Sequence, residues 1–401
     1  MQFVFIGNIN NEAFRLAHVL SELGHRCTVA LTQHGALHDP EQLLELEAYR
    51  DSRVLINGDL ASFSTWDWIT GRRDLKSAFR ALTHRPAVVM TGDMAHSIAH
   101  TLDQPYLSLV TGSDVTLWAS LPAVQRIRVR SPMLWASSLI SGTAPNDHLK
   151  RFAERQSSGI RRSSAVLTIA PGVSLSMDAA FAEIGVYPER RTPWRIRTAH
   201  DWGCVPPSTD GLQVLVGSRL TTGGSLGADV ADLNDKGTSQ VLLGWAEAKR
   251  MGLRGQLTLF CKGSATALAR FRGMATSLGL DDSVVWRREG SLQALLQEMS
   301  ASHVVVDSLG SSPPGRVTVD GIASGRTVMT NVTDSVQTRM LGAVFPNVMP
   351  VSSSAEFAAA LYQLDGSDQV VRTHGQASHR LSELLAPETM AKTFLREVAS
   401  L

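Results

Sequence analysis

The sequence predicts an α/β fold of two Rossmann-like domains, each built on a parallel sheet. Three observations favour this class. Short apolar, β-branched runs of strand length alternate with helical spacing along the whole chain. Residues 187–210, rich in Pro, Arg and Trp and without periodicity, divide this alternation into two halves. A chain of 401 residues also normally forms two domains.

The composition is that of a water-soluble protein. Hydrophobic residues make up 43% and charged residues 19% of the chain, and the net charge of +1 argues against a nucleic-acid partner. No apolar run approaches the ~20 residues that span a bilayer, and the first residues lack the pattern of a signal peptide. Three distant cysteines, Cys27, Cys204 and Cys261, indicate a reducing compartment. We expect a cytoplasmic protein, with contact at the inner membrane face left open.

The first half opens with a strand, a turn and a helix. Residues 3–6 form the expected strand, and apolar residues from Phe14 to Leu23 follow helical spacing. Gly7 begins the turn between them. It is either part of a phosphate-binding loop or only a tight turn, because the second and third glycines of a dinucleotide fingerprint are absent. Further strands are expected at 27–31, 53–56, 87–91, 106–110 and 165–170, and helices at 41–49, 75–82, 95–102 and 175–184.

The second half repeats the alternation. Its expected strands are short and apolar, as in sheets that are covered on both faces. They lie at 212–216, 257–260, 284–286, 304–306 and 327–330, with helices at 238–249, 265–278, 292–299, 316–324, 354–364 and 388–401.

Residues 303–331 carry the strongest local signal. A buried strand leads through a loop of Ser, Pro and Gly into a short helix that Gly325 ends, and a second buried strand follows. This is one right-handed crossover of a parallel sheet. The loop falls at the carboxyl end of its strand, where open α/β sheets bind ligands, and the helix start suits a phosphate.

The run Asp320-Gly-Ile-Ala-Ser-Gly-Arg-Thr-Val, with Gly315 before it, resembles a motif of retaining glycosyltransferases of group 1 (family 4), which have the GT-B fold. In that family an acid and a glycine-rich loop precede a helix that bears a second acid eight positions later. Asp320 matches the second acid, and Ser312 stands where the first acid is expected. The resemblance implies that Asp320 binds the donor ribose and that Ser312, Gly315 and Arg316 lie at the donor.

Two further segments match the same family. Arg219 follows the strand at 212–216, and Lys236 with the next glycine opens a helix. In the family these cations contact the donor diphosphate, and two cations with helix N–H groups can neutralise such a leaving group. Arg287 and Arg288 stand just past the expected strand 284–286, where the family holds the nucleotide base.

The segment Thr111-Gly-Ser-Asp114 resembles a family loop that faces the cleft. Asp114 either recognises the acceptor or donor sugar or caps the turn that follows it.

Residues 121–162 are basic, with apolar residues between the charges. Such a face suits an anionic lipid surface or a phosphorylated lipid acceptor, but it is also typical of a solvated helix. The basic residues are Arg126, Arg128, Arg130, Lys150, Arg151, Arg155, Arg161 and Arg162.

The resemblance implies a cytoplasmic GT-B enzyme of polysaccharide biosynthesis or a related process. It would move a hexosyl or related sugar from a nucleotide-diphosphate donor such as a UDP-sugar to a glycan, lipid-linked or natural-product acceptor, without a metal or cofactor. The rivals are a non-catalytic relative that binds a nucleotide or a partner, and a nucleotide-sugar epimerase. The implied domains, facing across a cleft, are residues 1–190 and 212–385, a linker at 191–211, and a helix at 386–401 that packs back toward the first domain.

Overall fold

A computed structural model of the chain resolves two compact units, Met1–Ile196 with Pro387–Leu401, and Arg197–Ala386. The structure describes residues 1–32, 39–58, 60, 65–70, 86–92, 94–102, 104–125, 142, 144–198, 211–218, 220, 235–261, 263–288, 290–310, 314–365 and 368–399. Within these residues no helix is both long enough and apolar enough to cross a bilayer.

The first unit contains a seven-stranded sheet in which every neighbouring pair is parallel. The strand order is β3-β2-β1-β4-β5-β6-β7. These strands are β1 (Gln2–Ile6), β2 (Arg26–Ala30), β3 (Leu55–Asn57), β4 (Ala87–Thr91), β5 (Tyr106–Leu109), β6 (Ala165–Thr168) and β7 (Arg191–Pro193).

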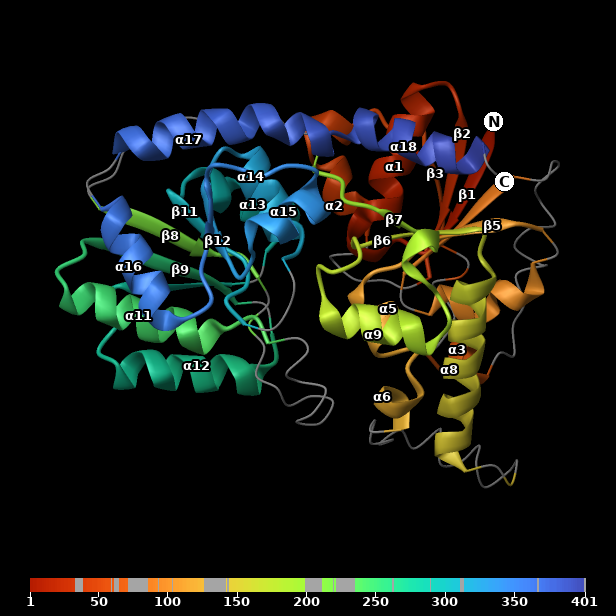
Figure 1. The fold of residues 1–401 in the computed structure, drawn as a ribbon, viewed down its shortest axis with the longest axis horizontal. Helices are drawn as coiled ribbons and strands as arrows, with labels where there is room; N and C mark the ends of the chain where they lie inside the picture. The colour runs from red at the N-terminus through yellow and green to blue at the C-terminus, as the bar shows by residue number, and fades with distance from the viewer. Residues whose placement is uncertain are drawn as a thin grey trace. The chain divides into compact units, whose positions relative to one another are not determined.

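Helices cover both faces of this sheet (Figure 1). On one face, Phe3 and Phe5 of β1 contact Phe394 of the last helix, which also packs on α1. On the other face, the strand residues Val4 and Val88 share a core with α3, α6, α8 and η4. The helices are η1 (Ile9–Asn11), α1 (Glu12–Glu22), α2 (Glu41–Leu44), η2 (Glu47–Tyr49), α3 (Thr65–Thr70), η4 (Ala95–Thr101), α5 (Gly112–Thr116), α6 (Leu121–Gln125), α8 (Pro145–Arg162), α9 (Leu175–Glu183), η5 (Pro188–Arg190) and α18 (Pro387–Ala399).

The second unit contains a six-stranded sheet, also parallel at each pairing, in the order β10-β9-β8-β11-β12-β13. Its central strands are apolar on both faces because helices cover both sides. The strands are β8 (Leu212–Val216), β9 (Gly255–Cys261), β10 (Val284–Arg288), β11 (Val304–Val306), β12 (Thr327–Thr330) and β13 (Val348–Pro350).

In β11 the alternate residues separate these two faces. Val304 and Val306 belong to the larger core with α11, α12 and α16, whereas Val305 packs with α13 and α14 on the opposite side (Figure 1). The helices of this unit are α11 (Thr238–Arg250), α12 (Ala265–Ser277), α13 (Leu292–Ser300), α14 (Arg316–Ala323), α15 (Asp334–Leu341), α16 (Ser354–Leu364), α17 (Asp368–Leu381) and η7 (Ser382–Leu385).

The predicted fold class is confirmed, and each predicted strand lies within two residues of an observed strand at both ends. The elements β13, α15 and α17 were not predicted from the sequence. Residues Arg191–Pro193, predicted as part of the linker, form the edge strand β7. The expected helix at 41–49 is divided into α2 and η2, and the one expected at 75–82 lies outside the described residues.

In each sheet the strand order reverses at one place, between β1 and β4 in the first unit and between β8 and β11 in the second. Open α/β sheets usually bind ligands at such a point, beyond the carboxyl ends of the strands. Two of the sequence candidates, Gly7 and Lys236, lie in connections that leave these central strands.

Gly7 has a structural role that its position in the turn explains. Its φ of +93° is in the left-handed region, and a Cβ atom built on it would lie 1.7 Å from the carbonyl oxygen of Thr91 on β4. Its own N–H donates to the carbonyl of Ala30 at 2.8 Å. Only glycine therefore allows the end of β1 to lie this close to the end of β4.

We predict that Gly7→Ala costs at least about 3 kcal/mol of unfolding free energy, because left-handed strain and a backbone clash add. The matched control is Gly24→Ala, since Gly24 has a similar φ of +84° but open space around its Cβ position. The control should lose only about 1–2 kcal/mol. Urea unfolding measures both variants, and equal losses would contradict the close approach at Thr91.

Candidate functional site

A buried carboxylate lies at the switch point of the second sheet. Asp307 directly follows β11 and is 2% exposed. Its Oδ2 accepts hydrogen bonds from the N–H of Gly315 at 2.5 Å, the hydroxyl of Thr318 at 2.7 Å and the N–H of Thr318 at 3.3 Å. The hydroxyl of Ser218, just after β8, donates to the Asp307 carbonyl at 2.5 Å. Three donors on a single oxygen fix this carboxylate in place.

The same carboxylate pairs with Lys236, a residue that the sequence analysis assigned to the diphosphate. The Nζ atom of Lys236 lies 3.5 Å from Oδ1 of Asp307, and the lysine side chain is 19% exposed. Lys236 is positioned by Gly237, the N-cap of α11 with a φ of +71°. A Cβ on that glycine would lie 2.5 Å from the N atom of Gly310. The N–H of Leu309 also donates to the Lys236 carbonyl at 3.1 Å.

The N-terminus of α14 therefore already holds an anion. Gly315 is its N-cap, and its N–H and that of Thr318, in the first turn, point to the Asp307 carboxylate. A negative charge at this end of a helix is favourable, for the reason that makes it suitable for a phosphate. Asp307 was not predicted as a site residue from the sequence. The available signal was an acid at the carboxyl end of a fully buried strand, next to the glycine-rich loop.

Asp320, the predicted ribose ligand, lies within α14 and is also buried. Its Oδ1 accepts a hydrogen bond from the N–H of Thr198 at 3.0 Å and lies 3.8 Å from Nη1 of Arg316, one turn earlier. The Arg316 side chain is 18% exposed, whereas the Asp320 side chain is only 3% exposed. This carboxylate thus holds the segment that enters the second unit, whatever it does for a ligand.

Other predicted residues lie apart from this cluster or outside the described residues. Arg219 and Ser312 belong to the undescribed part of the chain. Arg287 and Arg288 lie within β10 instead of beyond it. The Nε of Arg287 pairs with Glu298 of α13 at 3.0 Å, with the arginine side chain 57% exposed.

Asp114 belongs to the first unit. Its Oδ2 accepts hydrogen bonds from the N–H of Thr111 at 2.7 Å and from the Thr111 hydroxyl at 3.2 Å. Asp114 is fully buried at the start of the short helix α5. Both bonds run back to Thr111, three residues earlier, so they close the turn at 111–114 instead of capping the turn that follows Asp114. A role of Asp114 in sugar recognition stays a prediction.

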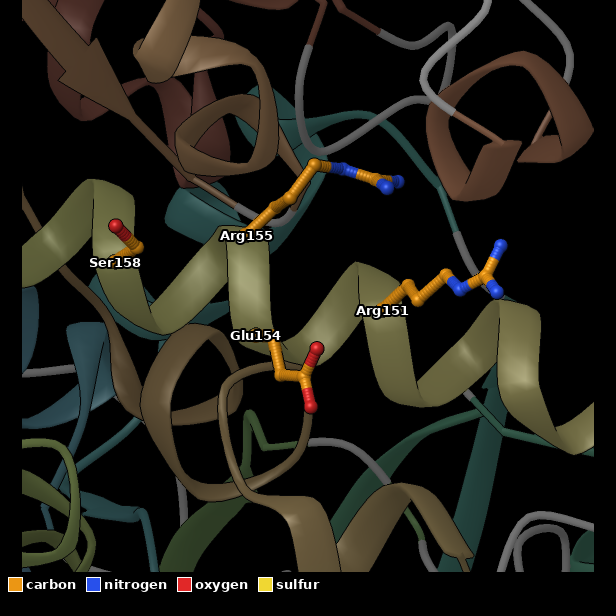
Figure 2. Close-up of a pocket in the computed structure, with 4 residues that line it drawn as sticks. All are labelled: Arg151, Glu154, Arg155 and Ser158. Atoms are coloured by element: carbon orange, nitrogen blue, oxygen red, sulfur yellow. The ribbon is translucent and has the colours of Figure 1, made fainter.

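The basic segment of the first unit is partly described, as helix α8. A hollow of about 320 Å³ on this helix is lined by Arg151, Glu154, Arg155 and Ser158. Figure 2 shows these four side chains on α8. The Nη2 of Arg155 donates to the carbonyl of Ile69 in α3 at 2.6 Å, and partial burial lowers the pKa of this guanidinium. Arg155 thus joins α8 to α3. Arg126, Arg128 and Arg130 lie outside the described residues.

No metal centre is formed by the described side chains, among which no group of three His, Cys, Asp or Glu residues could hold an ion. The expected independence of metal stays a prediction. No protein-family model and no curated protein sequence matches the chain.

Solved structures resemble the chain over nearly its whole length. Anabaena HepE in complex with UDP-glucose aligns with a TM-score of 0.63 and 16% identity over 100% of both chains. A glycosyltransferase from Rickettsia africae aligns at 0.62 and 11% identity over 98% of this chain and 97% of that chain. Sucrose-phosphate synthase from Thermosynechococcus elongatus aligns at 0.62 and 14% identity over 100% of this chain and 98% of that chain. This likeness establishes the GT-B fold.

We predict that Thr318→Val lowers the unfolding free energy by about 1.5–3 kcal/mol, since it removes a hydroxyl that donates to a buried carboxylate. The matched control is Thr276→Val, because the Thr276 hydroxyl donates to Asp281 at 2.8 Å on the exposed surface of the same unit. The control should change stability by less than about 0.5 kcal/mol. Chemical denaturation measures the unfolding free energy of both variants. Similar losses would show that the buried bond to Asp307 contributes no more to stability than the exposed bond to Asp281.

Proposed function

We propose that the protein is a retaining glycosyltransferase that moves a sugar from a nucleotide-diphosphate donor to an acceptor by front-face substitution. The observation that carries this proposal is the position of Lys236. Its ammonium group lies beside the N-terminus of α14, at the switch point of the second sheet of a GT-B fold. HepE, which has this fold, is described in complex with UDP and with UDP-glucose. A UDP-sugar is accordingly the donor that we propose.

This reaction depends more on stabilisation of the charge that develops on the leaving group than on a protein base. When the glycosidic bond to the nucleotide breaks, negative charge grows on the departing diphosphate, and a preorganised cation there lowers the barrier. Lys236 supplies that cation, and Arg219 is proposed as the second. The leaving phosphate itself helps to take the acceptor proton. Ser312, at the position of the family's first acid, would lie near the donor sugar, and no metal is required.

The acceptor is a glycan, a lipid-linked sugar or a natural product. The basic residues on α8 would suit an anionic lipid acceptor at the inner face of the membrane. A non-catalytic relative would keep nucleotide binding but lose turnover. A hydrolysis screen over common UDP-sugars separates the two, since measurable release of UDP supports the transferase and binding without release supports the non-catalytic alternative.

We predict that Lys236→Met weakens UDP binding by about ten- to a hundredfold, since one charge-assisted contact is lost and the carboxylate of Asp307 is left beside the bound anion without its cation. Lys249→Met is the matched control. Lys249 lies at the other end of α11, and its Nζ donates to the Leu253 carbonyl at 2.8 Å. Calorimetry should find the affinity of the control unchanged. Equal affinity in both variants and the wild type would remove Lys236 from the site.

We predict that Asp320→Asn both lowers the melting temperature and reduces the preference for UDP over 2′-deoxy-UDP by about tenfold. A carboxylate can accept bonds from two ribose hydroxyls, whereas the amide of asparagine has a single acceptor oxygen. The loss of stability alone follows from the bond to the N–H of Thr198. A lower melting temperature with an unchanged preference would leave Asp320 as a residue that only holds the entering segment.

A further inference from the structure

The ion pair between Lys236 and Asp307 has an unequal geometry. Asp307 is 2% exposed and is held through Oδ2 by the N–H and hydroxyl groups of Gly315 and Thr318. Lys236 is 19% exposed, and its Nζ approaches Oδ1 only to 3.5 Å. A tight ammonium–carboxylate hydrogen bond would be about 2.7–2.9 Å. The carboxylate is therefore fixed by its three donors, and its contact with the ammonium is longer than such a hydrogen bond.

A diphosphate bound by Lys236 would have to share this ammonium with Asp307. Lysine carries a compact charge on a flexible four-carbon stem, so its Nζ can reach toward a ligand while its Cα remains fixed by Gly237 and α11. The carboxylate cannot follow, because its three donors belong to the start of α14. Asp307 would also repel the second anion directly, since both lie near the same helix end.

We propose that Asp307 limits the affinity of the site for the nucleoside diphosphate, acting as a positioning residue through Lys236. This inference rests on the proposed function. A transferase must release its diphosphate product after every turnover, and a fixed internal anion makes that release easier. When the product leaves, the ion pair between Lys236 and Asp307 forms again, so the ammonium has an anionic partner in both states.

The test is Asp307→Asn, which keeps the shape of the side chain and removes its charge. The amide oxygen can still accept from Gly315 and Thr318, whereas the amide NH₂ would face Lys236 and cannot accept from it. Calorimetry with UDP should show binding about tenfold tighter than in the wild type, the order of one charge-assisted contact. Binding that is unchanged or weaker in the folded variant would overturn the proposal, and structural damage alone would not tighten it.

Two further variants make the result specific. Asp281→Asn removes the same charge at the exposed acceptor of Thr276, and its affinity for UDP should equal that of the wild type. We also compare the double variant Lys236→Met/Asp307→Asn with Lys236→Met alone. In this background Asp307→Asn should raise the affinity for UDP by less than about threefold, compared with about tenfold when Lys236 is present. An equal gain with and without Lys236 would show that Asp307 does not act through it.

The wild type provides a test that does not depend on the folding of a variant. An unopposed contact to the second phosphate would make UDP bind about ten- to a hundredfold more tightly than UMP. If Asp307 offsets the charge of Lys236, this ratio of affinities should be less than about tenfold. A ratio of tenfold or more overturns the inference and leaves the proposed function intact. A wild type that binds no UDP overturns both.

Discussion

The carboxylate of Asp307 is the contact on which the arrangement of the second unit's switch point depends. It joins the end of β11 to the first turn of α14 and to Lys236 before α11. A buried carboxylate without partners would cost several kcal/mol, so the three hydrogen bonds from Gly315 and Thr318 must persist if the fold is to keep the charge. The loop after β11 and the start of α14 therefore behave as one structural element beside Lys236, and any ligand at this edge meets the carboxylate together with the lysine.

The sequence could predict the two sheets because parallel strands that are covered on both faces appear as continuous apolar runs. The valines of Val304–Val306 are the clearest case, and all three are fully buried. The edge strands β7 and β13 were missed because each has only three residues and ends in proline, Pro193 and Pro350. Their register comes from the neighbouring strand, which no local pattern records.

The candidate site could be predicted only in part. Helix spacing and the family resemblance located Lys236 and the start of α14, because both are local features. The partner of Asp320, by contrast, is the N–H of Thr198, which is 122 positions away in the chain. Asp307 likewise meets its donors through the return of the chain at Gly315. Tertiary packing decides which backbone group lies next to a buried acid. A sequence motif can therefore identify the acid but not its hydrogen-bond partner.

The first unit is discontinuous in sequence, and this has a consequence for how the protein is made. Helix α18 supplies Phe394, which covers Phe3 and Phe5 of the first strand, yet residues 197–386 are synthesised in between. At about 5–20 residues per second, a ribosome needs on the order of ten to forty seconds for that interval. During this time Phe3 and Phe5 lack the side chain of Phe394 that packs on them in the finished protein. The last residue of the second unit is also made before α18, so the unit that begins first is the last to be synthesised in full.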